Sequence, residues 1–177
     1  AQRHSSGDRP IDLEFWNSQI EQVAKRGQRT LAVASAVMPG KESIRHEDVR
    51  EGLTLLGLFG LIDPPREEAI KAVQNCHSAG IKVKMITGDH ALTAAAIGRQ
   101  IGLDVSSEPI SGQELETMDD DKLQFYAMKS SIFARVSPEH KLRLVTALQA
   151  SEHITAMTGD GINDAPALKR ADVGVAM

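Results

Sequence analysis

The sequence predicts an α/β protein whose mostly parallel sheet has helices on both faces, preceded by a helix–strand piece of a second domain. Two observations support this fold class. From residue 53 onward, short apolar runs alternate with longer stretches of helical periodicity, as in repeated strand–helix–strand units. Several of these apolar runs end in loops of small and polar residues, which is typical of parallel strands whose carboxyl ends share one edge.

The start of the chain has a different pattern from the rest. Apolar residues recur at helical spacing over residues 12–27, which predicts a helix that ends at its final glycine. Residues 29–38, "RTLAVASAVM", follow as a predicted strand, and the polar stretch "PGKESIRHEDVREG" is expected to be a loop. We therefore predict one domain piece over residues 1–50 and a second domain over residues 51–177.

The predicted second domain opens with a strand and a helix. Residues 53–62 form a mainly apolar run without charged residues, the pattern of a strand covered on both faces. Pro64 and Pro65 are expected to begin a helix that Gly80 ends. The next expected elements are a strand over residues 81–86 and a helix over residues 91–102.

The remainder of the chain continues this alternation. Ser111 and Glu114 form a candidate capping box for a helix that contains residues 114–128. Ser137 and Pro138 likewise cap and begin a helix. The remaining expected elements are strands over residues 131–136, 154–158 and 172–177 and a short helix over residues 166–171.

The bulk composition is that of an ordinary soluble globular protein and argues against several functional classes. A net charge of −4 argues against binding through nucleic-acid phosphates. The single cysteine, Cys76, cannot form an internal disulfide. The longest apolar run, residues 53–62, is broken by glycines and is shorter than the roughly 20 residues that a membrane-spanning helix needs.

Polar and small residues gather after three of the predicted strands, in "MITGD", "FARVSPEHK" and "MTGDGIND". Because the carboxyl ends of parallel strands meet at one edge of a sheet, these loops are expected to form one site. Asp160 and Asp164 are hard oxygen donors suited to Mg²⁺ that also binds phosphate and water. Gly159 and Gly161 allow the backbone to turn sharply and to approach a ligand closely.

Thr87 and Lys141 add the groups that a phosphoryl site needs. Thr87 offers a hydroxyl and neighbouring backbone N–H groups to phosphoryl oxygens. Lys141 lies just inside the helix that begins at Pro138, from where its ammonium can reach the sheet edge and neutralise phosphoryl charge. Taken singly, a threonine in a capping loop and a lysine on the surface are ordinary features. Together with the acidic pair, they predict a phosphoryl-transfer site.

These motifs resemble those of a known family. The order "TGD", "PEHK" and "GDGINDAPAL" is similar to the later motifs of the haloacid-dehalogenase superfamily, which implies a Rossmann-like sheet of the HAD type. More narrowly, "DPPR", "MITGDHALTAAAIGRQIG", "FARVSPEHK" and "TGDGINDAPAL" resemble the phosphorylation domain of P-type cation-transporting ATPases. Residues 51–177 would then be that domain, and residues 1–50 the C-terminal piece of the nucleotide-binding domain.

The resemblance implies a mechanism in which ATP phosphorylates an aspartate and the aspartyl-phosphate drives a pump between conformations. Mg²⁺ and ATP would be the cofactors. The partners would be the transported cation and the remaining pump domains, with no nucleic acid. The chain would work at the cytoplasmic face of a membrane as a soluble part of an integral membrane protein. The transported ion would be a hard cation such as Ca²⁺, Na⁺, H⁺ or Mg²⁺.

Individual residues receive roles from the same resemblance. Thr87 would bind the phosphoryl oxygens, and Lys141 would offset their charge. Asp160 and Asp164 would ligate Mg²⁺, while Asn163 and Asp164 would orient the phosphate, the lysine and metal-bound water. The residues that would line the nucleotide are Arg29, Asp63, Arg66, Gly88, Asp89 and Arg135.

The sequence departs from the family at the nucleophile. The phosphorylated aspartate of the family lies in "DKTGT", which is absent here, and "DKL" at residues 121–123 lies in a helical pattern. We therefore expect a fragment without ATPase activity of its own, in which the sheet has a gap or closes differently. Two alternatives stay open: a free-standing soluble phosphatase of the superfamily, and a regulatory or binding module without a nucleophile.

Overall fold

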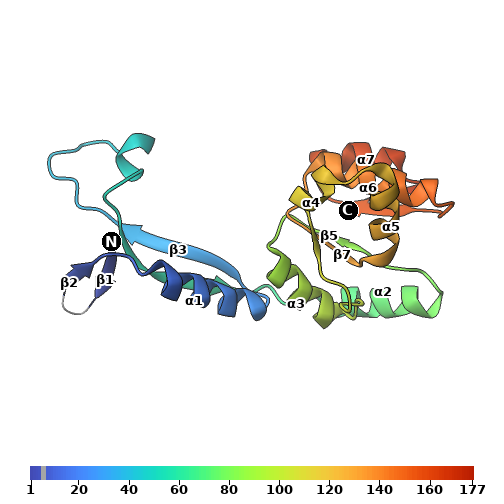
Figure 1. The fold of residues 1–177 in the computed structure, drawn as a ribbon, viewed down its shortest axis with the longest axis horizontal. Coiled ribbons are helices and arrows are strands. Elements are labelled where there is room, and N and C mark those ends of the chain that lie inside the picture. The colour runs from blue at the N-terminus through green and yellow to red at the C-terminus, as the bar shows by residue number, and fades with distance from the viewer. Residues whose placement is uncertain (5–6) are drawn as a thin grey trace. The chain divides into compact units, whose positions relative to one another are not determined.

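The computed structural model describes residues 1–4 and 7–177 and divides the chain into two compact units, Ala1–Asp63 and Pro64–Met177 (Figure 1). The division lies between Asp63 and Pro64, later in the chain than the predicted boundary after residue 50. The reason is strand β4 (Thr54–Leu61), which pairs with a strand of the first unit and so belongs to that unit.

The first unit holds a four-stranded sheet in the order β2-β1-β4-β3. Strands β1 (Gln2–His4) and β2 (Gly7–Arg9) are antiparallel, β1 and β4 are parallel, and β3 (Arg29–Ser35) is antiparallel to β4. The prediction that β4 opens the parallel sheet and is covered on both faces was wrong. Leu31 lies opposite Phe59 across the β3–β4 pair, and both side chains are exposed. An apolar run does not by itself specify which strand it pairs with. Here the partner of β4 is β3, a strand of similar length that comes earlier in the chain.

Helix α1 (Leu13–Lys25) packs on this sheet. Asp12 caps the helix, because its carboxylate accepts a backbone N–H of the first turn at 3.0 Å. Gly60 of β4 lets the helix approach, since a Cβ there would lie 3.0 Å from a methyl carbon of Val23. The polar segment predicted as a loop contains a short 3₁₀ helix, His46–Val49.

Among the residues described, the second unit contains five short strands, and every pairing between them is parallel, as the sequence predicted. They are β5 (Met85–Ile86), β6 (Ile110–Ser111), β7 (Ile132–Ala134), β8 (Ala156–Gly159) and β9 (Val173–Ala176). Strand β6 was not predicted. The strands form two ladders, β5-β7-β6 and β8-β9, and over the described residues no backbone ladder joins β5 to β8.

The helices of the second unit mostly begin where the sequence predicted. They are α2 (Glu67–Ser78), α3 (Ala91–Ile101), α4 (Gly112–Thr117), α5 (Asp120–Lys129), α6 (Pro138–Ala150) and α7 (Ala165–Arg170), with a 3₁₀ turn at Ile162–Asp164. The capping box at Ser111 and the cap at Ser137 are confirmed. Helix α2 begins later than predicted because Arg66 still has an extended backbone. None of the helices in the described parts of the chain is long and apolar enough to cross a membrane.

The helix predicted to contain residues 114–128 is in fact two helices. Met118 has an extended backbone, with φ −78° and ψ 134°, and ends α4. Asp119 caps α5, because its carboxylate accepts a backbone N–H of the first turn at 2.9 Å. An aspartate side chain competes for backbone N–H groups, so it favours a helix start over a helix interior. Arg143 of α6 donates to the carbonyl oxygens of Leu115 and Met118 at 2.7 and 3.0 Å, which satisfies carbonyls at the end of α4.

Strand β7 is the centre of the core in the second unit. Phe133 is buried in a cluster with side chains of α4, α5 and α6, including Leu115. Ile132, its neighbour in the strand, joins a second cluster with Val73 of α2 and Ala94 of α3. Because successive side chains of a strand point to opposite faces, this division places helices on both faces of the β5-β7-β6 sheet, as predicted.

Candidate functional site

Three loops of the second unit each follow a strand that is paired in parallel with another. Residues 87–89 follow β5, residues 135–137 follow β7, and residues 160–164 follow β8. Strands β5 and β7 are paired, and Ile86 of β5 also packs against the cluster that contains Met157 of β8. The expected convergence of the three loops is therefore supported by the β5–β7 pairing and by the packing of Ile86 against the cluster that contains Met157.

The loop after β5 is held by hydrogen bonds within itself and to the loop after β7. The Thr87 hydroxyl donates to the Asp89 carboxylate and accepts the Asp89 backbone N–H, both at 3.1 Å. The backbone N–H groups of Arg135 and Val136 donate to the carbonyl oxygens of Asp89 and Thr87 at 3.1 and 3.2 Å. Gly88, between the two polar residues, is exposed. The structure thus places Thr87, Asp89 and Arg135 side by side.

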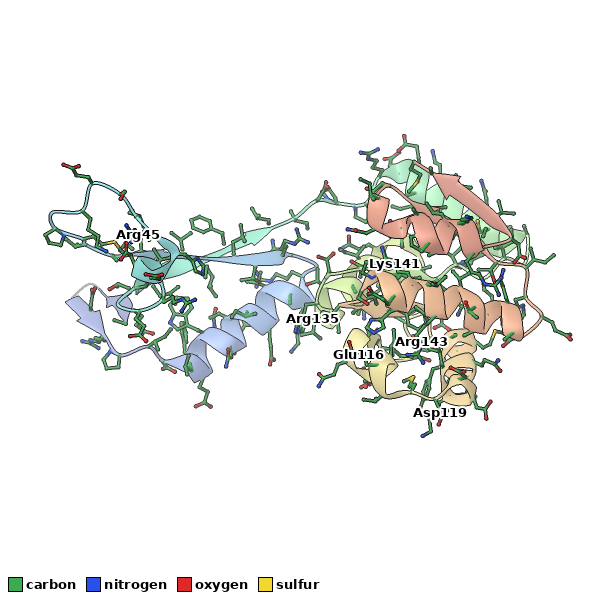
Figure 2. All side chains as sticks on the ribbon, turned by 90° about the horizontal axis from the view of Figure 1, so that it is seen from above. Arg45, Glu116, Asp119, Arg135, Lys141 and Arg143 are labelled. Atoms are coloured by element: carbon green, nitrogen blue, oxygen red, sulfur yellow. The ribbon has the colours of Figure 1, made fainter. Side chains whose placement is uncertain are left out.

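Arg135 has an unusual backbone conformation for a residue with a side chain. Its φ is 52°, in the left-handed region where a Cβ is crowded by its own backbone. This bend lies between the hydrogen bonds that Arg135 and Val136 donate to the loop after β5. The Arg135 side chain is exposed, and Figure 2 labels it together with Lys141. Its proposed contact with nucleotide stays a prediction.

Lys141 of α6 and Asp164 of the loop after β8 form an ion pair, with Nζ 2.5 Å from Oδ1. The two side chains keep only 20% and 9% of their surface exposed. The hydrogen bond from Lys141 lowers the pKa of Asp164 from its ordinary value, although burial opposes the shift. The charge of Lys141 and the backbone N–H groups of Gly161 and Asp160 add smaller effects in the same direction. Asp164 is therefore a carboxylate at neutral pH.

Gly159, the last residue of β8, makes room for this carboxylate. A Cβ at position 159 would lie 2.7 Å from both Cβ and Oδ2 of Asp164, so any side chain would displace the acid. The backbone N–H of Asp164 donates to the carbonyl oxygen of Gly161 at 3.0 Å and closes the loop. These contacts fix the position of the Asp164 carboxylate beside α6.

Asp160 and Asn163 are exposed members of the same loop. With Asp164, Asp160 offers two carboxylates within five residues, a donor set that fits Mg²⁺ because this ion often binds protein through one or two carboxylates plus phosphate and water. Over residues 1–4 and 7–177, no group of three or more His, Cys, Asp or Glu side chains is placed to hold a metal ion. Metal binding by Asp160 and Asp164 therefore stays a prediction.

Three residues predicted to bind nucleotide lie outside these loops. Arg29 begins β3 of the first unit, and Asp63 is the last residue of that unit; both are exposed. Arg66 occupies the cap position of α2, where its side chain makes no capping hydrogen bond. The nucleotide-binding role of all three stays a prediction.

A cavity of about 390 Å³ opens beside the loop after β7. Its walls come from the starts of α3, α4 and α6, and they include His90, Gly112, Glu116, Arg135 and His140. The ring of the buried His140 accepts a hydrogen bond at Nδ1 from the backbone N–H of Ser137, with an N···N distance of 3.2 Å. Its Nε2 lies 3.6 Å from a carboxylate oxygen of Glu116. Figure 2 labels Glu116 and Arg135 on this part of the second unit.

Gly112 and His140 were missed by reasoning from the sequence. A Cβ at position 112 would lie 2.2 Å from the carbonyl oxygen of Arg135 and 3.2 Å from Nδ1 of His140. A partial signal exists, because glycine is a poor helix former and stands here at the first position of a helix, directly after its cap. That signal does not show that Arg135 and His140 are the residues that approach Gly112.

Comparisons with known proteins agree with the fold. A family model described as haloacid dehalogenase-like hydrolase matches residues 5–172. The chain is 54% identical over 170 residues to the cation-transporting ATPase pma1 of Synechocystis sp., which covers 94% of the chain and 19% of that protein. It is 46% identical over 159 residues to the calcium-transporting ATPase of Bacillus subtilis, covering 89% of the chain and 18% of that protein.

A fungal relative shows the same partial coverage. The endoplasmic reticulum calcium ATPase srcA of Aspergillus fumigatus is 40% identical over 172 residues, covering 90% of the chain and 18% of that protein. The chain therefore spans about a fifth of the length of these curated relatives. The parallel strands with helices on both faces and the family match over residues 5–172 lead to one conclusion. The chain belongs to the haloacid dehalogenase-like hydrolases.

Proposed function

We propose that this chain is the phosphoryl-handling part of an ATP-driven cation pump that works through an aspartyl-phosphate intermediate. The names of relatives at 40–54% identity, cation-transporting and calcium-transporting ATPases, support the proposal. The observation that carries it is the Lys141–Asp164 pair, which joins the first turn of α6, after β7, to the loop after β8. A largely buried ion pair is a costly way to gain stability, and perturbed titratable groups at strand ends are typical of functional sites.

Thr87, Lys141 and Asn163 would act directly on the phosphoryl group. The Thr87 hydroxyl, which donates to the Asp89 carboxylate in this structure, would turn its proton to a phosphoryl oxygen when phosphate binds. The Lys141 ammonium, oriented by Asp164, would offset negative charge as the phosphoryl group is transferred. The exposed amide of Asn163 would orient the phosphate and the metal-bound water.

Asp160 and Asp164 are the residues that would hold Mg²⁺. When bound, the ion would neutralise phosphoryl oxygens and help to align the transfer. The lowered pKa of Asp164 keeps its carboxylate ionised at neutral pH, which is the form that a metal site requires. Gly159 and the backbone of the loop keep that carboxylate in place.

We also propose that the chain has no ATPase activity by itself. Its sequence contains no "DKTGT", and covalent phosphoryl transfer requires a nucleophile. In the described part of the chain, β5 pairs only with β7 and β8 only with β9, although Ile86 of β5 packs against the cluster around Met157 of β8. A strand that carries the nucleophile would fit between β5 and β8 and pair with both edges.

The remaining parts of the proposal concern the whole pump. The first unit would belong to a nucleotide-binding domain, and the second would be the phosphorylation domain at the cytoplasmic face of a membrane. The relatives named for calcium favour a hard cation as the transported ion. The residues that would line ATP are Arg29, Asp63, Arg66, Gly88, Asp89 and Arg135.

Titration of the chain with inorganic phosphate, with and without Mg²⁺, tests this proposal by ³¹P NMR. We expect weak phosphate binding that depends on Mg²⁺. Asp160→Asn should weaken it by at least about tenfold, because even the outer-shell partners of metal ligands contribute 10- to 100-fold. Asp121→Asn, which alters an exposed carboxylate in the first turn of α5, is the matched control and should leave binding unchanged. Equal binding by Asp160→Asn and the unaltered chain would contradict the proposal.

A further inference from the structure

We propose that Gly112 is a positioning residue that sets the geometry of both the Thr87 loop and the start of the helix that carries Lys141. The inference rests on the proposed phosphoryl-binding function of these two elements. Gly112 is buried at the first position of α4 and lines the cavity beside Arg135. It acts through its two close neighbours, Arg135 and His140.

The closest neighbour of Gly112 is a backbone group. A Cβ at position 112 would lie 2.2 Å from the carbonyl oxygen and 3.2 Å from the carbonyl carbon of Arg135. A flexible side chain could rotate away from an added methyl group, but a backbone carbonyl moves only if its peptide plane turns. Arg135 has little freedom for such a change, because it already occupies the left-handed region at φ 52°.

The same peptide plane holds the Thr87 loop. The carbonyl of Arg135 and the N–H of Val136 belong to one planar peptide unit, so displacing the oxygen turns the N–H as well. That N–H donates to the carbonyl oxygen of Thr87 at 3.2 Å, and the Arg135 N–H donates to the carbonyl oxygen of Asp89 at 3.1 Å. A side chain at position 112 would therefore move the backbone that carries the Thr87 hydroxyl.

The second neighbour of Gly112 connects it to Lys141. A Cβ at position 112 would lie 3.2 Å from Nδ1 of His140, the atom that accepts the Ser137 N–H in the capping box of α6. Ser137 Oγ in turn accepts the His140 N–H at 3.4 Å, and the carbonyl oxygen of Ser137 accepts the Lys141 N–H at 3.2 Å. Pressure on the His140 ring would thus act on the first turn of the helix that presents Lys141.

The backbone conformation of Gly112 does not itself require glycine. Its φ lies outside the left-handed region, unlike that of Gly102 at +86°, and glycine weakens a helix relative to alanine. The close approach of Arg135 and His140 is therefore the physical reason for a glycine at this position. Through Arg135 and His140, the two contacts link α4 to the Thr87 loop and to the start of α6, the elements that would bind the phosphoryl group.

Gly112→Ala tests this inference, with Gly98→Ala as the matched control. Gly98 is also a buried helix glycine of the second unit, but its nearest neighbour is a side-chain methyl of Ile132, 2.6 Å from an added Cβ. In ¹H–¹⁵N spectra of the full chain, Gly112→Ala should shift the amide signals of Thr87, Gly88 and Lys141. Gly98→Ala should leave these three signals in place. Shifts confined to α4 in Gly112→Ala would overturn the inference.

Phosphate affinity in the presence of Mg²⁺ supplies the functional readout. Gly112→Ala should raise the phosphate Kd by about tenfold, since displacing a binding group by about 1 Å can cost up to 10²-fold. Gly98→Ala should bind phosphate as the unaltered chain does, even if it unfolds at a lower temperature. An unchanged Kd in Gly112→Ala overturns the inference. If the unaltered chain binds no phosphate, the proposed function fails, whereas the amide shifts still decide the positioning role.

A rescue experiment covers the case in which Gly112→Ala does not fold. Arg135→Gly introduces the residue that tolerates left-handed and other backbone conformations, so the peptide can turn away from the methyl group at position 112. The double variant Gly112→Ala/Arg135→Gly should regain folding. Adding Gly112→Ala to the Arg135→Gly variant should raise the phosphate Kd by a smaller factor than adding it to the unaltered chain. A double variant that remains unfolded, or shows the full Gly112→Ala effect, overturns the inference.

Discussion

Lys141 and Asp164 are 23 positions apart in the chain and are joined by one short, largely buried hydrogen bond. The resemblance implied that Asp164 orients the lysine, and the structure places the two side chains in direct contact. Lys141 lies in α6, which begins just after β7, and Asp164 lies in the loop after β8. Val145 of α6 and Met157 of β8 share one buried cluster, which brings the two elements together. The pair therefore serves as the link between two strand ends in the candidate site.

Replacing Lys141 by methionine should destabilise the second unit by about 2 kcal/mol, because it leaves the Asp164 carboxylate buried without its cationic partner. Urea denaturation at pH 7 measures this loss. Lys122→Met removes an exposed ammonium 3.5 Å from Asp119 and is the control; it should change stability by less than about 0.5 kcal/mol. Equal effects of the two variants would contradict the structural role of the Lys141–Asp164 pair.

The same pair has a defined pH dependence. The pKa of Asp164 is lowered in the folded chain, chiefly by the hydrogen bond from Lys141, so its stabilising effect is present above the unfolded pKa of about 3.9. It is lost as pH falls below that value and through the folded pKa. The difference in unfolding free energy between the unaltered chain and Lys141→Met should therefore shrink from pH 6 to pH 3. A constant difference over this range would contradict the assignment.

Among the elements, helices α4 and α5 show how a side chain divides a helical pattern. Apolar spacing alone continues through residues 114–128, but Met118 is extended and Asp119 caps a new helix. The carboxylate of Asp119 accepts a backbone N–H, and its pKa is lowered mainly by that bond to Lys122. Arg143 then binds the carbonyl groups that the end of α4 leaves free.

Asp119→Ala distinguishes two helices from one. If Asp119 caps α5, losing the carboxylate removes the cap, and the midpoint of thermal unfolding should fall by about 3 °C. If the segment were one continuous helix, alanine would instead raise the midpoint because it is the best helix former. Asp121→Ala, in the first turn of the same helix but not at its cap, is the control and should give a smaller change.

At the scale of the whole molecule, the strands of the second unit form two ladders with no hydrogen-bonded strand between them in the described residues. The shared cluster around Ile86, Val145 and Met157 keeps these ladders together through side chains. We infer that a nucleophile-bearing strand completes the sheet in the intact pump. Without it, the groups proposed to bind the phosphoryl group are present, but the aspartate that would accept it is not.

Incubation of the chain with ATP labelled at the γ-phosphate, followed by acid quenching, should yield no phosphoenzyme above background. A pump known to form an aspartyl-phosphate shows that the assay works. Acid-stable, alkali-labile label on this chain would contradict the proposal, and peptide mapping would then identify the residue that carries it. Binding of phosphate with Mg²⁺ is expected to persist in the same preparation, since Thr87, Lys141 and Asp164 are all present.

Much of the fold and of the site could be predicted because the signals are local. Caps at Ser111 and Ser137 depend on side chains that reach backbone groups a few residues away. The parallel strands and the small, polar loops after them follow from the alternation of patterns along the chain. Thr87, Lys141 and Asp164 could be selected on the same basis, since each stands at or near the end of a predicted strand.

The remaining features are set by contacts between residues far apart in the chain, which no local pattern encodes. β4 pairs with β3 in the first unit, a partner that its apolar run alone does not identify. The left-handed bend at Arg135 and the close approach of Gly112 appear only when α4 packs against the loop after β7. The sequence by itself determined which chemical groups could form the site. Tertiary packing decided how those groups are held, because position depends on the neighbours that surround each backbone segment.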